Sequence, residues 1–251
     1  AELFHRLPRG VRLTSAGDAL VAHARRVLRD LESGRASVRE VAGLVAGRLD
    51  LASLPTLTLD PLAAVLGRFR HRYREVSVRL LQPEQRSSVL DAVRGGEAEL
   101  GFADAQPGGD RELESVHIGW QELVVTMPPG TKRPRGGSLT VDRLLSLELI
   151  TGQQGTLARD LLGGQARRRG REFNLVVEVA HRESALHLVV AGAGCALLPE
   201  PLARIAALEG AVLASVSPPV RRELHLLRRP GPLSPAARAF QSLLLRGREE
   251  P

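Results

Sequence analysis

The stretch from residue 15 to residue 45 reads SAGDALVAHARRVLRDLESGRASVREVAGLV, and its pattern decides how the whole chain is interpreted. Apolar or small residues recur along it in alternating steps of four and three, at Leu20, Ala24, Val27, Leu31, Gly34, Val38, Val41 and Val45. This heptad spacing keeps one narrow stripe of a helix facing a partner helix. At about 1.5 Å per residue, such a helix extends about 45 Å. Because it cannot bury the stripe alone, we predict a dimer-forming helix over residues 15–46, with packing on its own domain as the alternative.

The helix has start and stop signals, and a different pattern follows it. Thr14 and Ser15 can cap its first turn, and Gly47 ends it. Beyond Gly47, short apolar runs alternate with helical stretches, which is typical of parallel sheets covered by helices. Two such units flank the Gly- and Pro-rich loop 128–137. We predict strands at residues 48–54, 76–81, 98–103, 114–118, 122–127, 148–151, 174–180, 195–198, 211–216 and 223–227, and helices at residues 60–72, 84–94, 140–145, 155–169, 183–191, 201–208 and 234–246.

The composition fits a globular protein of one large or two smaller domains, with 43% hydrophobic residues and only 3% aromatics. The net charge is +7, but Lys132 is the only lysine among 35 basic residues, and the arginines are spread along the chain. Charge alone therefore fits a DNA-contacting surface and a solvated basic surface equally well.

Cys195 is the only cysteine, so no internal disulfide can form, and the cytoplasm is the expected location. No apolar run reaches the roughly 18 residues that span a membrane.

Five patterns, the first of them in two pieces, are recognisable when the chain is read in order. Residues 3–6 (LFHR) and 11–17 (VRLTSAG) are followed by residues 47–51 (GRLDL), 69–76 (FRHRYREV), 95–102 (GGEAELGF) and, after Glu183, residues 189–199 (VVAGAGCALLP). Together these segments resemble the LysR family of bacterial transcriptional regulators, from the end of the winged helix-turn-helix to the effector domain. The chain departs from the family pattern at Glu75, usually Pro, at Glu99, usually Asp, and at Cys195, usually Ile or Val.

The resemblance implies an α/β fold, in which a long linker helix precedes a two-lobed effector domain of the periplasmic-binding-protein-like type 2 fold. It implies that the winged helix-turn-helix ends within residues 1–14, that the linker helix covers residues 15–46, that lobe I comprises residues 47–119 and 220–251, and that lobe II comprises residues 120–219. Two strands near residues 120–126 and 220–226 would cross between the lobes. The recognition helix would lie upstream of Ala1, so we expect a sequence that lacks most of its DNA-binding domain.

The ligand site that the resemblance implies is the cleft between the lobes, where helix N-termini meet the ends of strands. Backbone N–H groups at a helix N-terminus favour an anion, and Arg86 can bind a carboxylate through its planar fork. We therefore expect a small-molecule effector such as an organic anion. The alternatives are ordinary capped or solvated helix starts and, for Phe102, core packing. The candidate residues are Pro55, Thr56, Leu57, Gln85, Arg86, Phe102, Asp104, Thr151, Gly152, Gln153 and His181.

Two arginines are candidates for DNA contact. Arg6 and Arg9 lie in the segment that matches the wing. By resemblance they contact DNA phosphates or the minor groove, which positions a protein without reading the base sequence. Ordinary surface arginines are the alternative. The resemblance also implies a homodimer or homotetramer that binds DNA through its N-terminal domain.

No catalytic constellation is visible in the sequence. Gly192-Ala193-Gly194 follows a predicted helix rather than a strand, which excludes a dinucleotide fingerprint, and residues 151–156 lack the Gly-Lys-Ser/Thr of a phosphate-binding loop. The seven histidines show no metal-ligand spacing. Cys195 is interpreted as a core residue rather than a redox switch. We therefore expect neither an enzyme nor a metal or cofactor. The alternative function is an extracytoplasmic solute-binding protein of the same fold, which gives no reason for the long helix.

Overall fold

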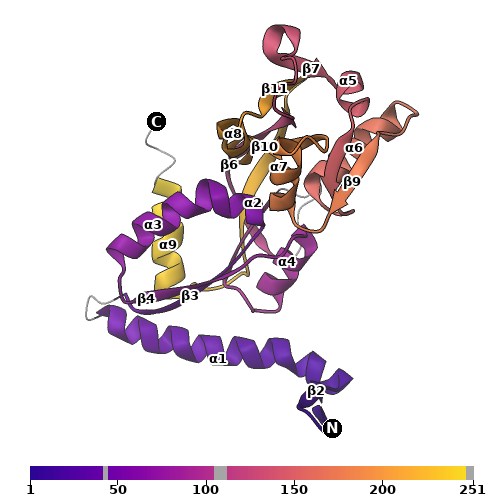
Figure 1. Ribbon diagram of the computed structural model, residues 1–251. Coiled ribbons are helices and arrows are strands. Elements are labelled where there is room, and N and C mark those ends of the chain that lie inside the picture. Colours follow the sequence, from indigo (N-terminus) through magenta and orange to yellow (C-terminus); the bar gives the residue numbers. More distant parts are fainter. Residues whose placement is uncertain (42–44, 105–111, 247–251) are drawn as a thin grey trace.

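The computed structural model describes residues 1–41, 45–104 and 112–246, and the chain folds into an N-terminal hairpin, a long helix and two α/β lobes (Figure 1). The first elements are β1 (Phe4–Arg6), β2 (Val11–Leu13), α1 (Ser15–Val41), β3 (Gly47–Ser53), α2 (Pro55–Leu57), the π-helical turn η1 (Thr58–Leu62), α3 (Ala63–Arg72), β4 (Val76–Leu81), α4 (Arg86–Arg94) and β5 (Leu100–Asp104). They are followed by β6 (Glu114–Met127), the 3-10 turn η2 (Arg135–Gly137), β7 (Ser138–Thr140), α5 (Val141–Leu145), β8 (Leu149–Gly152), α6 (Leu157–Arg168), β9 (Leu175–Val179), α7 (Arg182–Val190), β10 (Cys195–Pro199), α8 (Glu200–Leu208), β11 (Val212–Ser217), β12 (Val220–Arg228) and α9 (Pro235–Arg246).

The strands after α1 form one continuous sheet with the order β4-β3-β5-β12-β6-β10-β8-β9, and β11 and β7 branch from it at β6. The pairs β3–β4, β3–β5, β8–β9 and β8–β10 are parallel, as the alternation of strands and helices predicts. The expected parallel pairing does not extend to β6 and β12, which pair antiparallel with each other and with their neighbours. The reason is that β6 carries the chain from the first half of the sheet to the second, and β12 carries it back.

Strand β6 is a single element over Glu114–Met127, although the sequence predicts two strands at 114–118 and 122–127. Gly119 looks like a break, but the strand continues through it with φ at +142°, which glycine adopts without a Cβ penalty. A register shift in the pairing with β12 falls beside it, between Leu224 and His225. Pairing with β12 from Glu114 to Leu123 holds β6 together where the local sequence suggests a turn.

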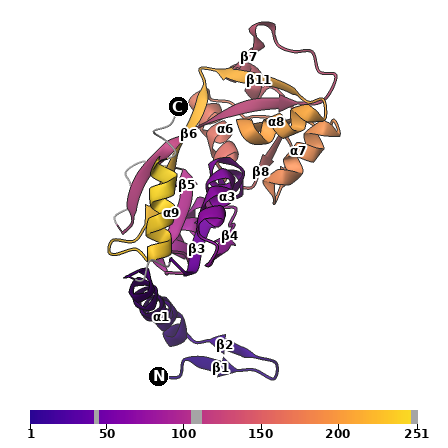
Figure 2. The same ribbon diagram turned by 90° about the vertical axis from the view of Figure 1, so that its left-hand side faces the viewer.

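The strands β6 and β12 run side by side between two halves of the molecule (Figure 2). One half holds a single hydrophobic core and the other holds one core on each face of the sheet. We call the half that contains β3, β4 and β5 lobe I and the half that contains β8, β9 and β10 lobe II. The core of lobe I includes Phe69, Phe102 and Phe240, whose rings meet edge to face and join α3, β5 and α9. In lobe II, alternate residues of each strand point to opposite faces. One face packs on α5 and α6, and the other face packs on α7 and α8.

The long helix α1 begins as predicted, because Thr14 Oγ1 accepts a hydrogen bond from Gly17 N at 3.0 Å. Residues 42–44 of the predicted helix lie outside the described residues. Both views place α1 along the base of lobe I, and the β1–β2 hairpin projects from its N-terminal end (Figures 1 and 2). Its apolar stripe is open to solvent in the protomer, with exposed fractions of 45% at Leu20, 67% at Val27, 53% at Leu31 and 74% at Val38. None of the described helices is long and apolar enough to cross a bilayer.

Cys195 is the first residue of β10 and is buried in the core of lobe II. Burial raises the pKa of the Cys195 thiol, and the nearby Glu148 carboxylate raises the pKa further. Because the thiolate is the reactive form, we expect Cys195 in the native protein to react with a disulfide reagent at pH 8 at least about tenfold more slowly than in the unfolded chain. The same protein in guanidinium serves as the control. Equal rates in both states would show that the thiol is accessible and poised for redox chemistry.

Candidate ligand-binding cleft

Two neighbouring cavities lie where the lobes face each other. The larger has a volume of about 340 Å³, and Leu54, Arg86 and Asp104 of lobe I line it together with Gly155, Leu157, Asp160, Leu161, Gly164, Gln165 and Arg168 of lobe II. The smaller has a volume of about 30 Å³. It is lined by Thr56 of lobe I, by Arg222 of β12 and by Leu123, Ile150, Thr151, Gly152, Thr156, Leu157, Ala158, Ala185, Leu197, Leu198, Pro199 and Leu202. Leu157 lines both cavities, which places them next to each other.

Arg222 is the central polar residue of the smaller cavity, and only 4% of it is exposed. Its Nε donates a hydrogen bond to Gln121 Oε1 at 2.9 Å, and its Nη2 donates to Thr56 Oγ1 at 2.8 Å and also to Gln121 Oε1. Gln121 is itself buried, and its Nε2 donates to the carbonyl oxygen of Asp60 at 3.2 Å. Arg222 and Gln121 face each other on the two crossing strands. These bonds therefore tie both crossing strands to the first loop of lobe I.

The loop after β3 differs from the prediction of a helix that starts at residue 60. Helix α2 starts directly at Pro55, whose fixed φ suits the first helical position, and a kink at Asp60 separates it from α3. The early start buries Pro55, Thr56 and Leu57. Of these three predicted residues, Thr56 reaches the smaller cavity, while Pro55 and Leu57 are absent from the linings of both cavities.

The other predicted residues of lobe I have three different positions. Two of them line the larger cavity, one lies close to lobe II, and one lies in the core. Arg86 Nε donates to the carbonyl oxygen of Asp104 at 2.9 Å, and both residues line the larger cavity. Gln85 is exposed at the start of α4, and its amide carbon lies 3.8 Å from the place where a Cβ of Gly155 would stand. Phe102 is fully buried, and its ring centroid lies 6.1 Å from that of Phe240. The structure therefore places Phe102 in the core of lobe I.

In lobe II the end of β8 and the loop after it contribute most of the predicted residues. Thr151 and Gly152 line the smaller cavity, and Thr151 Oγ1 donates to the carbonyl oxygen of Gly152 at 2.8 Å. Gln153 is exposed, and its carbonyl oxygen accepts from Thr156 Oγ1 at 2.7 Å. His181 is exposed and lines neither cavity, and its Nδ1 is 3.4 Å from Glu84 Oε1 of lobe I. It is the N-cap residue of α7, where its carbonyl oxygen accepts from Ser184 N at 3.2 Å, but its side chain makes no capping hydrogen bond.

The sequence analysis missed Arg222 and Gln121. Strand periodicity contains a signal for the first, because Arg222 stands in phase with the buried Leu224 and Leu226 of β12. An arginine at the buried positions of a strand indicates a paired or functional charge.

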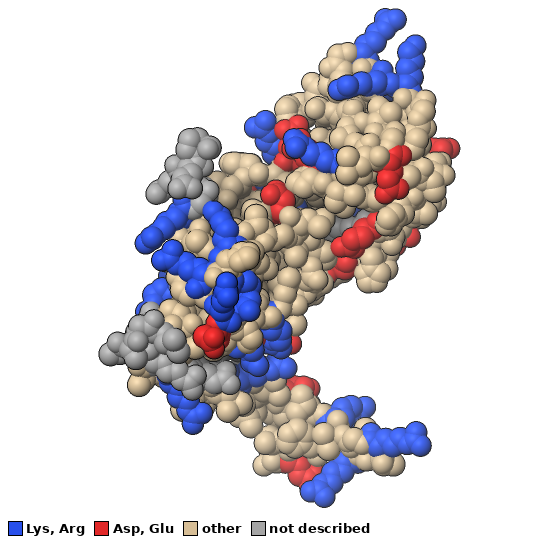
Figure 3. All heavy atoms as spheres, turned by 60° about the vertical axis from the view of Figure 1, so that its left-hand side comes forward, with Lys and Arg blue, Asp and Glu red and all other residues tan. Residues whose placement is uncertain are grey.

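At the opposite end of the molecule, Arg6 ends β1, and Arg9 lies in the turn between β1 and β2. Both residues are exposed. On the face in Figure 3, Lys and Arg also occur over lobe I and at the far tip of lobe II, with Asp and Glu between them. This face therefore shows no single continuous basic stripe.

The two lobes, the crossing strands and the cleft define a ligand-sensing domain of the periplasmic-binding-protein-like type 2 fold. Residues 42–248 match the LysR substrate binding domain. The chain is 32% identical over 212 residues to the HTH-type transcriptional regulator TfdS of Cupriavidus pinatubonensis, covering 81% of this chain and 69% of TfdS. It is 26% identical to the uncharacterized HTH-type transcriptional regulator YbhD of Escherichia coli, covering 97% of this chain and 77% of YbhD. Full-length CbnR, solved with its target DNA, superposes with a TM-score of 0.65 at 23% identity, covering 98% of this chain and 84% of CbnR.

The chain therefore belongs to the family of LysR-type transcriptional regulators. Members of this family bind DNA and small-molecule effectors, act as oligomers and are regulators rather than enzymes. The alternative of an extracytoplasmic solute-binding protein is not favoured, because the named relatives are transcriptional regulators.

Proposed function

We propose that this chain senses a small organic molecule in the cleft between its lobes and passes the signal through α1 to a DNA-binding head in the cytoplasm. The effector contacts would come from Thr56, Gln85, Arg86, Asp104, Thr151, Gly152, Gln153 and His181, while Pro55, Leu57 and Phe102 would support the walls. Residues 1–14 would form the wing, with Arg6 and Arg9 on the DNA backbone. Residues 15–46 would form the dimerisation helix, residues 47–119 and 220–251 lobe I, and residues 120–219 lobe II.

The observation that carries the proposal is the position of the larger cavity. Its lining comes from both lobes, with Arg86 and Asp104 on one side and Asp160 and Arg168 on the other. A ligand that contacts both lobes binds one lobe arrangement more tightly than another and therefore shifts the population between them. The volume of about 340 Å³ falls within the range of small-molecule sites. Because α1 lies along lobe I, a change in lobe arrangement moves lobe II relative to α1 and the head (Figure 1).

A screen of small metabolites tests this proposal. We expect at least one compound to raise the melting temperature of the chain and to change operator binding by the protein with its complete head. The substitution Arg86→Ala removes a charged wall of the cavity and should weaken that compound about tenfold, since a hydrogen bond to a charged group contributes about 1.5–3 kcal/mol. Isothermal titration measures both affinities.

The control is Arg94→Ala at the other end of α4, where the side chain pairs with Asp91 at 3.1 Å on the surface. It should leave the affinity unchanged. If no compound in a broad library changes both melting and DNA binding, or if Arg86→Ala has no effect on the compound found, the sensing role of this cleft is wrong.

A further inference from the structure

A further cavity, separate from the cleft between the lobes, lies where α1 passes lobe I, and its volume is about 210 Å³. Arg25 and Leu28 of α1 line one side of it. The other side is lined by Arg48 and Asp50 of β3 and by Arg79 of β4. None of these residues lines either cavity of the cleft. Three arginines from three different elements therefore converge on a cavity that the sensing of an effector between the lobes does not use.

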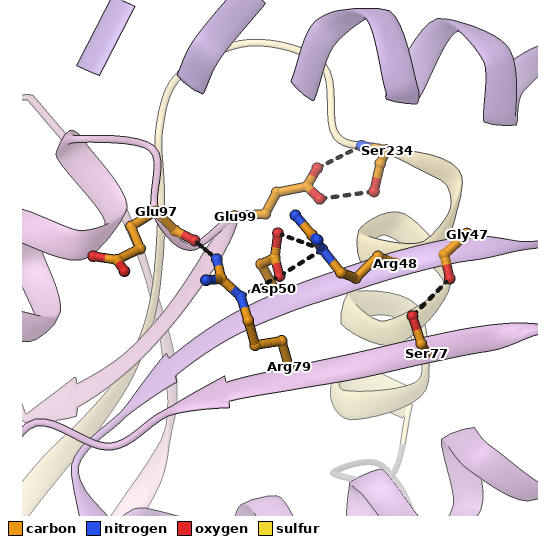
Figure 4. Close-up of polar contacts among 8 residues, drawn as sticks. All are labelled: Gly47, Arg48, Asp50, Ser77, Arg79, Glu97, Glu99 and Ser234. Carbon is orange, nitrogen blue, oxygen red and sulfur yellow. Dashed lines mark hydrogen bonds and ion pairs between the residues drawn. The ribbon is translucent and has the colours of Figure 1, made fainter. Parts of the chain in front are cut away.

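A buried carboxylate orients two of these arginines (Figure 4). Only 6% of Asp50 is exposed, and its oxygens accept from Arg79 Nε at 2.8 Å and from Arg48 Nε at 3.2 Å. Arg79 Nη2 donates to the carbonyl oxygen of Glu97, which also lines the cavity, at 2.6 Å. Within the described part of the chain, neither Nη of Arg48 nor Nη1 of Arg79 makes a hydrogen bond. The two guanidiniums are therefore held in place while several N–H donors remain for a ligand.

The third guanidinium comes from α1. The side chain of Arg25 is 49% exposed, and its ion pair with Glu97 has a distance of 3.9 Å. An exposed pair of this length is weak, so a stronger acceptor in the cavity can compete for Arg25. Three guanidiniums and two carboxylates line the cavity, which leaves one positive charge in excess.

The position of the cavity is compatible with a dimer that forms through the apolar stripe of α1. At about 100° per helical residue, Arg25 and Leu28 lie about 140° and about 80° around the helix from Leu20 of the stripe. A second copy that packs on the stripe therefore contacts a different side of α1 from the side that faces the cavity.

The arrangement of donors favours a phosphate group. Phosphate monoesters carry a charge of about −1.5 to −2 at neutral pH and offer three strong acceptor oxygens, and the planar forks of arginines match phosphate geometry. A carboxylate has only two oxygens in one plane, which fit donors on opposite sides of a cavity less well. A volume of about 210 Å³ has room for several water-sized groups, and hence for a phosphate with a small organic body.

We infer that this cavity binds a small phosphate-bearing compound, held by Arg25 on α1 and by Arg48 and Arg79 on lobe I. Because the ligand contacts both sides, it binds most tightly when α1 lies against lobe I, and it shifts the population toward that arrangement. The joint between α1 and lobe I thereby receives a signal of its own. This inference does not depend on which compound occupies the cleft between the lobes, or on whether any does.

The experiment titrates inorganic phosphate into the whole chain at pH 7.5 and constant ionic strength, and amide chemical shifts locate the bound ion. We expect the amide signals of Asp50, Gly96 and Glu97 to shift with one dissociation constant on the order of 1 mM. Arg25→Gln should weaken binding at least about fivefold, because hydrogen bonds to charged groups are among the stronger ones. Amide hydrogen exchange at Leu28 should slow at saturating phosphate, since the ligand holds α1 against lobe I.

Two variants serve as controls. Arg204→Gln removes the same charge from an exposed residue of α8, which pairs with Glu200 at 2.8 Å. It should leave the dissociation constant unchanged and thus exclude an effect of net charge. Arg86→Ala removes an arginine of the cleft, and it should also bind phosphate as tightly as the wild type does.

The site is wrong if the amides of Gly96 and Glu97 do not respond to phosphate, if those of the cleft, such as Gly155, respond in their place, or if Arg25→Gln binds phosphate as tightly as the wild type. A DNA duplex of unrelated sequence that shifts these amides when phosphate does not would assign the cavity to the DNA backbone and overturn a site for a small ligand. Unchanged exchange at Leu28 would overturn the contact of the ligand with α1. All of these measurements leave the test of the cleft, which uses Arg86→Ala and a metabolite screen, unaffected.

Discussion

Replacing Glu99 with alanine is expected to lower the free energy of unfolding by about 3 kcal/mol, and the melting temperature by about 6–12 °C. Glu99 is buried between β3 and α9, and its two carboxylate oxygens accept from Ser234 N at 2.6 Å and from Ser234 Oγ at 2.7 Å (Figure 4). Ser234 Oγ in turn accepts from Ala237 N at 3.2 Å, which caps the start of α9. Alanine would leave buried donors of Ser234 without an acceptor and loosen the helix that carries Phe240.

Urea unfolding measures this loss, with Glu97→Gln as the control. Glu97 lies two residues earlier, its side chain is 38% exposed, and it pairs with Arg25 only at 3.9 Å. Exposed pairs of this kind contribute about 0–1 kcal/mol, so the control should change stability by less than about 1 kcal/mol. Equal effects of the two substitutions would show that the carboxylate of Glu99 does not hold α9.

The elements predicted best from the sequence are those whose pattern is local. The predicted strand at 76–81 coincides with β4, and the predicted helix at 234–246 starts one residue before α9. Strand β6 could not be predicted as one element, because its continuity through Gly119 depends on pairing with β12, which follows about a hundred residues later in the chain. The helical start at Pro55 was missed for a related reason, since Asp60 and Pro61 offer a stronger local start signal than Leu54 and Pro55 do.

The residues of the candidate site also fall into those that a local pattern predicts and those that depend on distant segments of the chain. The topology of parallel strands brings the C-terminal ends of strands and the residues that follow them together at one edge. Such positions are occupied by Thr56, Arg86, Asp104, Thr151 and Gly152. Arg222 and Gln121 lie in the middle of strands, where sequence reasoning expects core residues. They become cleft residues only because the two crossing strands pass between the lobes. The width of the cleft depends on how closely the lobes approach, which no local pattern encodes.

Replacing Leu31 with glutamate is expected to convert the oligomer into monomers, or to leave at most the contacts made outside α1. Leu31 lies in the middle of the apolar stripe of α1, with Val27 and Val38 on either side, and all three side chains are more than half exposed in the protomer. Burial of one such side chain contributes about 1.5–3 kcal/mol. In a pair of helices, Leu31→Glu replaces that gain on both partners by the cost of burying a carboxylate. We therefore expect dimer affinity to fall by at least about a hundredfold.

Light scattering at about 10 µM measures the result as a mass near the 27.1 kDa of one chain. The control is Arg35→Glu, an exposed position on α1 outside the stripe, where a larger change of charge should leave the mass unaltered. Because the paired heads of a dimer bind two half-sites together, the protein with its complete head should also lose most of its operator affinity with Leu31→Glu. An unchanged mass would show that the stripe of α1 packs against something other than a second copy. In that case the coupling of the effector cleft to the DNA-binding heads would have to pass through the lobes themselves.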